Sequence, residues 1–161
     1  MISFSLFFIT LLILFSEQKY IFLSSYILFF LLNLLINYIL KIILKHPKPN
    51  ENIDLFHFIK EKIEYERFGT PSVNCQSCLF STFFILFSTK NLFYFFFYLF
   101  LSFYVIYQEV YNNISYYYQI LIATIIGIII SIIAYQLSLL FLKGKTELKE
   151  EENAPEIRGL L

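Results

Sequence analysis

The stretch RFGTPSVNCQSCLFSTFFILFST, residues 67–89, joins a polar segment to a long apolar run. Proline near a helix start fits the first turn, where its missing N–H is not needed. We expect Thr70 to cap this helix, and we expect Ser72 and the free N–H groups of the first turn to suit an anion. The apolar run has the length of a membrane span, which needs about 20 residues with a range of about 17–25.

The composition of the whole chain is that of a membrane protein. Of the 161 residues, 58% are hydrophobic and 21% are aromatic, which is more apolar surface than a soluble domain of this size can bury. Twelve basic and twelve acidic residues give a net charge of zero, so no basic face predicts nucleic acid as a partner. We expect membrane lipids as partners, and the sequence leaves the oligomeric state open.

Five apolar segments are predicted to be helices, because backbone groups in lipid must be satisfied within each segment. The second, third and fifth are long enough to span a membrane, whereas the first and fourth are short and need help from interfacial tyrosines. The predicted fold is an all-α, multi-spanning transmembrane bundle over residues 1–142, followed by a polar C-terminal tail over 143–161. The expected spans are about 2–15, 20–44, 71–89, 92–107 and 117–142.

The first segment is apolar like a signal peptide. It lacks a positively charged start and a cleavage site of small residues. We therefore expect an uncleaved first membrane segment.

Cys75 and Cys78 form a C-x-x-C pair at the start of the third segment. Two thiols cannot close a four-ligand zinc site, and free thiols inside an apolar helix behave as small hydrophobic groups. A redox pair is the less favoured alternative. We expect no metal and no cofactor.

The number of segments places the connections on two faces. The loop 45–70 and the turn 108–116 share one face, and the tail lies on the other. Polar groups gather at the first face, and polar groups at membrane depth are costly, so their clustering predicts a site. Lysine and arginine residues divide equally between the faces, so the positive-inside rule leaves the orientation undecided.

Three polar clusters form this predicted site. They are KIILKHPKP (41–49), GTPSVN (69–74) and YQEVYNNISYYYQ (107–119). In the first, Lys41 and Lys48 are two helical turns apart, so both ammonium groups suit one phosphate until the prolines end the helix. Lysines that snorkel to the membrane boundary are the alternative interpretation.

In this order the clusters resemble the three motifs of the type 2 phosphatidic acid phosphatase superfamily, most closely its dolichyl pyrophosphate phosphatase branch. The first motif of the family is Lys, six residues, Arg-Pro, and the second is Pro-Ser-Gly/Ser-His. The third is Ser-Arg, five residues, His, three residues, then Asp, or Gln in the dolichyl branch. The resemblance covers about residues 35–135 and implies a helical membrane fold with a lipid phosphate or pyrophosphate substrate.

The departures from these motifs fall on the positions that carry the family's chemistry. The resemblance implies a histidine nucleophile, which an acidic residue or Gln orients, where this chain has Ser115 and Gln119, and a histidine acid where it has Asn74. A serine hydroxyl needs a neighbouring base to attack, and an amide cannot give up a proton near neutral pH. The third-motif arginine position holds Glu109, whose charge repels a phosphate. We therefore expect no intact catalytic site.

Phosphate binding is then left to Lys41, Lys48 and Ser72. His46 and His57 are candidates for a substitute nucleophile, although solvated loop histidines are the favoured interpretation, because nothing in the sequence fixes their position to about 3 Å.

Three hypotheses follow. The favoured one is a non-catalytic relative in the endoplasmic reticulum that binds lipid phosphate, with polyprenyl or dolichyl pyrophosphate as the candidate lipid and the site face in the lumen. The second is an active, divergent dolichyl or polyprenyl pyrophosphate phosphatase, which the resemblance would connect to N-glycosylation. The third is a structural membrane protein whose motifs match by chance.

Overall fold

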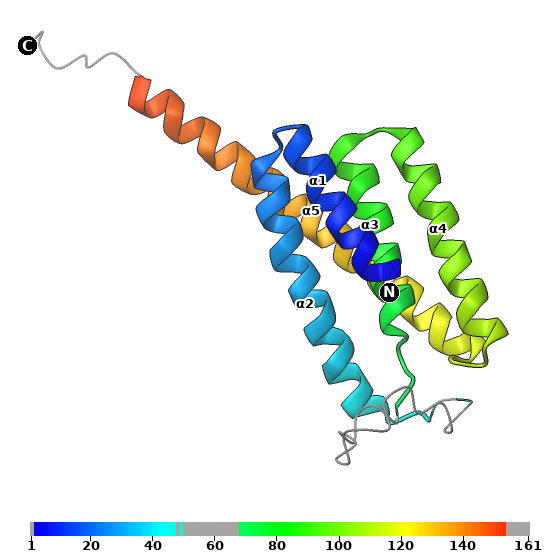
Figure 1. Ribbon diagram of the computed structural model, residues 1–161. Coiled ribbons are helices and arrows are strands. Elements are labelled where there is room, and N and C mark those ends of the chain that lie inside the picture. The colour runs from blue at the N-terminus through cyan, green and yellow to red at the C-terminus, as the bar shows by residue number, and fades with distance from the viewer. Residues whose placement is uncertain (1, 48, 50–67, 154–161) are drawn as a thin grey trace, which may run out of the picture.

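The computed structural model describes residues 2–47, 49 and 68–153, and five α-helices build this part of the chain (Figure 1). They are α1 (Ile2–Ser16), α2 (Tyr20–Leu44), α3 (Val73–Thr89), α4 (Leu92–Tyr111) and α5 (Tyr117–Asn153). The predicted all-α membrane bundle is confirmed.

Helix α3 is the centre of the bundle, because it packs against each of the other four helices. Of its 17 residues, 11 are buried and none is fully exposed, and the buried ones include the polar Gln76, Ser77, Ser81 and Thr82. Around it, aromatic rings from α1, α2 and α3 form a packed cluster, in which the Tyr26 and Phe80 rings stack with their centroids 5.5 Å apart. The stretch 67–89 therefore supplies the helix that organises the fold.

The lengths of the helices differ from the predicted spans. α2, α4 and the Tyr117–Gly144 part of α5 are long and apolar enough to cross a membrane, and α1 and α3 are shorter apolar helices. α4 continues to Tyr111, past the expected end at 107, and α3 begins only at Val73. The third segment is thus shorter, and the fourth longer, than the apolar runs suggested. With three candidate spans, the chain is an integral membrane protein.

Helix α5 continues to Asn153, well into the residues predicted as a polar tail. Lys and Glu make up most of this stretch, and both are strong helix formers. In Figure 1 this last part of α5 projects beyond the other helices.

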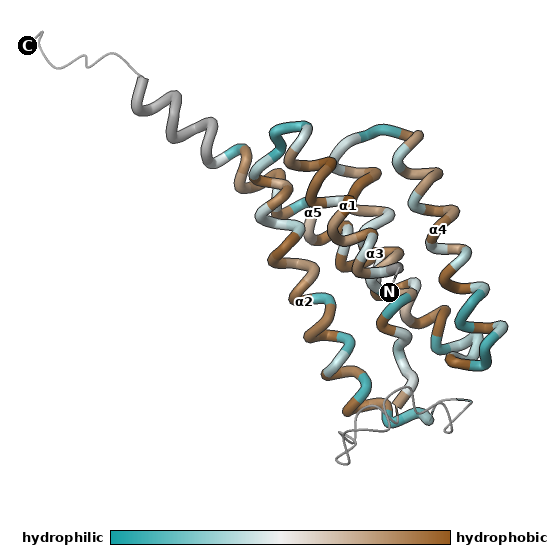
Figure 2. The backbone as a smooth tube through the Cα atoms, in the orientation of Figure 1, coloured by the Kyte–Doolittle hydropathy of each residue, from teal (hydrophilic) through white to brown (hydrophobic). Residues whose placement is uncertain are grey.

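The two ends of the bundle carry the connections in the predicted order. The α1–α2 and α3–α4 turns lie at one end, and the α2–α3 and α4–α5 connections lie at the other (Figure 1). In Figure 2 the hydrophilic residues mark these turns, while the middle of each helix is largely hydrophobic. The predicted site face is the end that carries the α2–α3 and α4–α5 connections.

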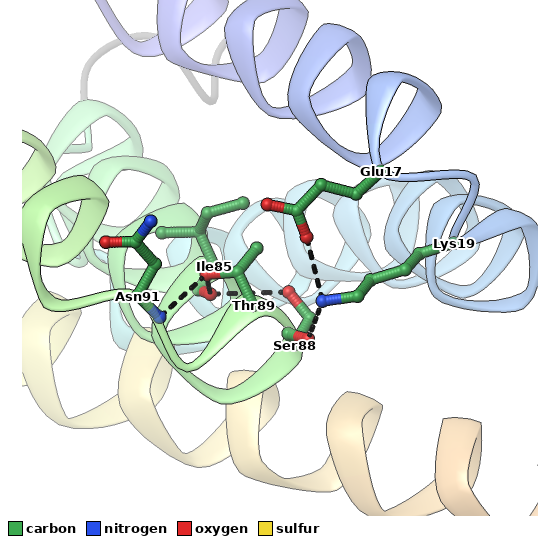
Figure 3. Close-up of polar contacts among 6 residues, drawn as sticks. All are labelled: Glu17, Lys19, Ile85, Ser88, Thr89 and Asn91. Carbon is green, nitrogen blue, oxygen red and sulfur yellow. Dashed lines mark hydrogen bonds and ion pairs between the residues drawn. The ribbon is translucent and has the colours of Figure 1, made fainter.

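At the other end of the bundle, Lys19 links the α1–α2 turn to α3 (Figure 3). The Lys19 ammonium donates to the Ser88 carbonyl oxygen at 2.8 Å and pairs with Glu17 at 2.8 Å. Cations near the last carbonyl groups of a helix are favourable, because these groups carry the negative end of the helix dipole. Lys19 thus ties the α1–α2 turn to the C-terminal end of α3.

Helices α3 and α5 approach closely at Gly127. A Cβ added there would lie 2.6 Å from the carbonyl oxygen of Gln76, a separation that side chains do not tolerate. Glycine is therefore required at this crossing, since it alone lets the two backbones meet.

Candidate functional site

Glu109 lies at the centre of the predicted site. Its carboxylate accepts from the Ser72 hydroxyl (Oγ to Oε2, 2.6 Å) and from the Asn74 amide (Nδ2 to Oε1, 3.0 Å). The Cys75 thiol donates to Oε2 at 3.5 Å. The Glu109 residue is only 3% exposed. A buried carboxylate is costly unless it is hydrogen-bonded, and three donors meet that need here.

The donors come from the N-terminal end of α3. Ser72 is the N-cap residue, in an extended conformation, and its hydroxyl oxygen accepts from the Cys75 N–H at 3.4 Å. The expectation that Thr70 caps the helix is wrong, because the helix begins three residues later and the buried Thr70 hydroxyl has no hydrogen-bond partner among the described residues. The positive end of the α3 dipole therefore faces the Glu109 carboxylate, which is the arrangement that favours an anion.

Helix α4 brings Glu109 to this place, and the turn after α4 brings Ser115. The N–H groups of Ile114 and Ser115 donate to the Glu109 carbonyl oxygen at 2.9 and 3.4 Å. Asn113 takes a left-handed conformation, with φ 51°, which turns the chain from α4 into α5. The structure thus gathers Ser72, Asn74 and Glu109, with the backbone of Ser115 beside them.

Gln119 does not contact Glu109 in the hydrogen bonds described above, and it links the start of the α2–α3 connection to α5. It is fully buried, its Nε2 donates to the Pro47 carbonyl oxygen at 3.0 Å, and its Oε1 accepts from the Tyr116 N–H at 3.0 Å. Gly69 packs on it so closely that a Cβ would lie 2.7 Å from Oε1. Gly69 also donates to the His46 carbonyl oxygen at 2.8 Å. The contacts of Gln119 are those of a structural anchor for the ends of the loop.

Of the predicted cationic and histidine residues, the structure describes Lys41 and His46. Lys41 is half-buried in the last turn of α2, which ends at Leu44 before Pro47. Lys48 and His57 lie outside the described residues. The exposed ring of His46 meets Tyr118 edge-on, with the ring centroids 5.7 Å apart.

The sequence interpretation missed a buried amide network next to the site. The Gln76 side chain donates to Asn33 Oδ1 at 2.8 Å and accepts from Asn37 Nδ2 at 2.7 Å. Asn37 also donates to the Pro71 carbonyl oxygen at 3.1 Å, just before the Ser72 cap. Asn33 and Asn37 are four residues apart in an apolar segment, which puts them on one helix face. That spacing was the available signal, because amides at membrane depth are costly without partners.

The first helix also reaches the site, which the sequence did not predict. The Ser3 hydroxyl of α1 donates to Asn74 Oδ1 at 3.1 Å. The Asn74 amide therefore connects two helices, since its nitrogen donates to Glu109 of α4.

Cys75 and Cys78 are both free and buried. Within residues 2–47, 49 and 68–153, no group of three or more His, Cys, Asp or Glu side chains has the geometry to hold a metal ion. The two thiols therefore lie inside the bundle, one of them against Glu109.

Comparison with known proteins identifies the family. The model of the PAP2 superfamily matches residues 21–142, which is more than half of the chain and includes all three polar clusters. The searches of curated proteins and of solved structures found no significant match. The family match contradicts the hypothesis of a structural membrane protein that is unrelated to this superfamily. The chain, an α-helical membrane bundle with these three clusters at one end, therefore belongs to the type 2 phosphatidic acid phosphatase (PAP2) superfamily.

Proposed function

We propose that the chain is a non-catalytic PAP2 protein whose anion-binding position is filled by its own Glu109. The observation that supports this most strongly is the pair of short hydrogen bonds from Ser72 and Asn74 to the Glu109 carboxylate, at 2.6 and 3.0 Å. These donors lie at the N-terminus of α3, where a phosphate would otherwise find them. A phosphate group there must displace a carboxylate of the same sign.

The positions that would make and break bonds are also unsuited to catalysis. An amide at Asn74 cannot donate a proton to a leaving oxygen near neutral pH. Ser115 has a hydroxyl where the resemblance expects a nucleophilic imidazole, and hydroxyls attack only when a base activates them. Loss of a nucleophile alone typically lowers kcat by about 10⁶. In our proposal the catalytic histidines of the family are therefore replaced without compensation.

In this proposal the protein still binds a lipid phosphate or pyrophosphate headgroup weakly. Lys41 and Lys48 are the two lysines of the first motif, and the sequence interpretation assigns that motif to the site face. A charge-assisted contact to phosphate stabilises by about 1.5–3 kcal/mol. Ser72 belongs to the same predicted set, but its hydroxyl already donates to Glu109. The two lysines therefore supply most of the affinity in this proposal.

The ligand and the compartment follow from the resemblance to the dolichyl branch. We place the protein in the endoplasmic reticulum, with the site face in the lumen and dolichyl or polyprenyl pyrophosphate as the lipid. The charge distribution supports neither orientation over the other.

A second candidate function has one observation in its favour. The Ser72 hydroxyl donates to a carboxylate at 2.6 Å, and a hydroxyl beside a base is the arrangement of an activated nucleophile. A divergent pyrophosphate phosphatase that attacks through Ser72 is therefore the alternative. It predicts turnover that Ser72→Ala abolishes.

A binding titration tests the proposed function. Purified protein in nanodiscs is titrated with farnesyl pyrophosphate, and we expect weak, saturable binding that Lys41→Ala weakens by about tenfold, which corresponds to about 1.4 kcal/mol. Lys90→Ala is the matched control, since Lys90 is exposed just past the C-terminal end of α3, at the opposite end of the bundle. Equal loss in both variants would show non-specific attraction and would contradict a headgroup site at the end of α2.

A further inference from the structure

Helix α1 lies before the part of the chain that matches the family, which begins at residue 21. It nevertheless packs against α2, α3 and α4. Figure 1 shows α1 in front of α3, in the space between α2 and α4. A helix outside the matched region therefore covers the central helix that carries the site.

One face of α1 is specialised for this position. Leu6, Thr10 and Leu14 are fully buried, while Phe8 and Leu12 are 61% and 69% exposed. Residues four apart share one side of a helix, so the buried face continues along the length of α1. The opposite face carries large apolar side chains, as a helix surface in contact with lipid does.

Two hydrogen bonds fix the helix in register with the site. The Ser3 hydroxyl donates to Asn74 Oδ1 at 3.1 Å, and the Thr10 and Tyr98 hydroxyls are 3.0 Å apart. Ser3 is 4% exposed, so the side of the first turn of α1 that carries Ser3 is buried against Asn74. Asn74 in turn donates to Glu109. The end of α1 is thus part of the same hydrogen-bonded chain as the carboxylate.

We infer that α1 is an internal cover, which closes the Asn74–Glu109 pair toward the surrounding lipid. A headgroup or a small reagent that approaches between α2 and α4 reaches the pair only after the first turns of α1 have moved away. The cover acts at the same site as the proposed function, but it does not depend on whether that site binds phosphate. Access to the site is then set by the packing of α1.

The chain contains a natural reporter of this access. Cys75 and Cys78 are its two cysteines, both are fully buried, and the Cys75 thiol contacts Glu109. Modification of Cys75 by N-ethylmaleimide therefore measures how often the site opens. No ligand is needed, so failure of this test is distinct from failure of the phosphate-binding proposal.

The test compares two leucines of α1. The full-length protein in nanodiscs is treated with N-ethylmaleimide, and the label on Cys75 is followed by peptide mass spectrometry. Leu6→Ala removes a buried side chain and should raise the rate about tenfold or more, because packing loss in a helix favours its local opening. Leu12→Ala is the matched control at a lipid-facing position, and its rate should stay within about twofold of the unmodified protein.

A second variant serves if Leu6→Ala does not fold. Ser3→Ala with Thr10→Val removes the two hydroxyls and nearly preserves the volume, and it should raise the rate about fivefold, as expected for two interhelical hydrogen bonds in a membrane. The inference is overturned if the destabilised variant labels no faster than Leu12→Ala. It is also overturned if Cys75 of the unmodified protein labels as fast as it does in detergent-denatured protein, or if the intact mass shows that α1 is removed.

Discussion

Replacement of Glu109 by glutamine should strengthen phosphate binding at the proposed site. The carboxylate holds donors from Ser72 and Asn74 at 2.6 and 3.0 Å. A phosphate oxygen that used the same donors would lie about 4 Å from it, and two unit charges at this distance repel by about 4 kcal/mol at an effective dielectric constant of about 20. Glutamine has nearly the same shape as glutamate and removes that charge.

The expected gain in binding free energy is smaller than the repulsion energy that the substitution removes. The new amide side chain would still occupy some of the donors, and the phosphate must lose water. We expect Glu109→Gln to lower the Kd for inorganic pyrophosphate and for farnesyl pyrophosphate by at least about tenfold, or about 1.4 kcal/mol. Calorimetric titration of the purified protein in nanodiscs measures this.

Glu17→Gln is the control, because Glu17 pairs with Lys19 at the opposite end of the bundle. Its Kd values should equal those of the unmodified protein. A folded Glu109→Gln variant that binds no more tightly than Glu17→Gln would refute the reasoning, since the carboxylate would then not be the obstacle to anions.

Three further predictions concern the scaffold. Gly127→Ala should lower stability by about 1–3 kcal/mol, because the new Cβ meets a backbone carbonyl of α3 at 2.6 Å. Gly144→Ala has open space around it among the described residues and should not lower the melting temperature, because alanine favours a helix more than glycine does. Asn113 begins an N-x-S sequon but should stay unmodified, because the serine of the sequon is 8% exposed and α5 starts two residues later; a glycosidase-sensitive mobility shift lost in Asn113→Gln would contradict this. Single cysteines placed in the loop 45–70 and in the tail 143–161 should label from opposite sides of a vesicle, and labelling from one side would contradict the five-helix topology.

The sequence predicts the bundle well because apolar segments separated by polar turns leave few alternatives in lipid. It misplaces boundaries where tertiary contacts decide them. α4 was expected to end at 107, before a polar pair, but Glu109 finds donors on α3 and the helix continues to Tyr111. These partners are 37 and 35 residues away in sequence, so local pattern cannot reveal them.

At the site, too, the sequence predicted some features, and tertiary contacts decided the others. The sequence interpretation placed the clusters that contain Ser72, Asn74 and Glu109 at one membrane face, and in the structure the Glu109 carboxylate accepts from Ser72 and Asn74. Their roles stay predictions. The spacing did not indicate that the Glu109 carboxylate would accept from the serine and the asparagine instead of facing an external anion. Nor did it indicate that Gln119 would bond to Pro47, because the path of the loop is set by the fold.

Phosphate release from dolichyl pyrophosphate in vesicles tests the central claim most directly. The unmodified protein should release no more phosphate than vesicles without protein, because Asn74, Glu109 and Ser115 lack the groups for transfer. A variant with Asn74→His, Glu109→Arg and Ser115→His should rise above that background. Turnover by the unmodified protein that is lost in Ser72→Ala, His46→Ala or His57→Ala would contradict the account, since it would show a working nucleophile in a site that we describe as filled.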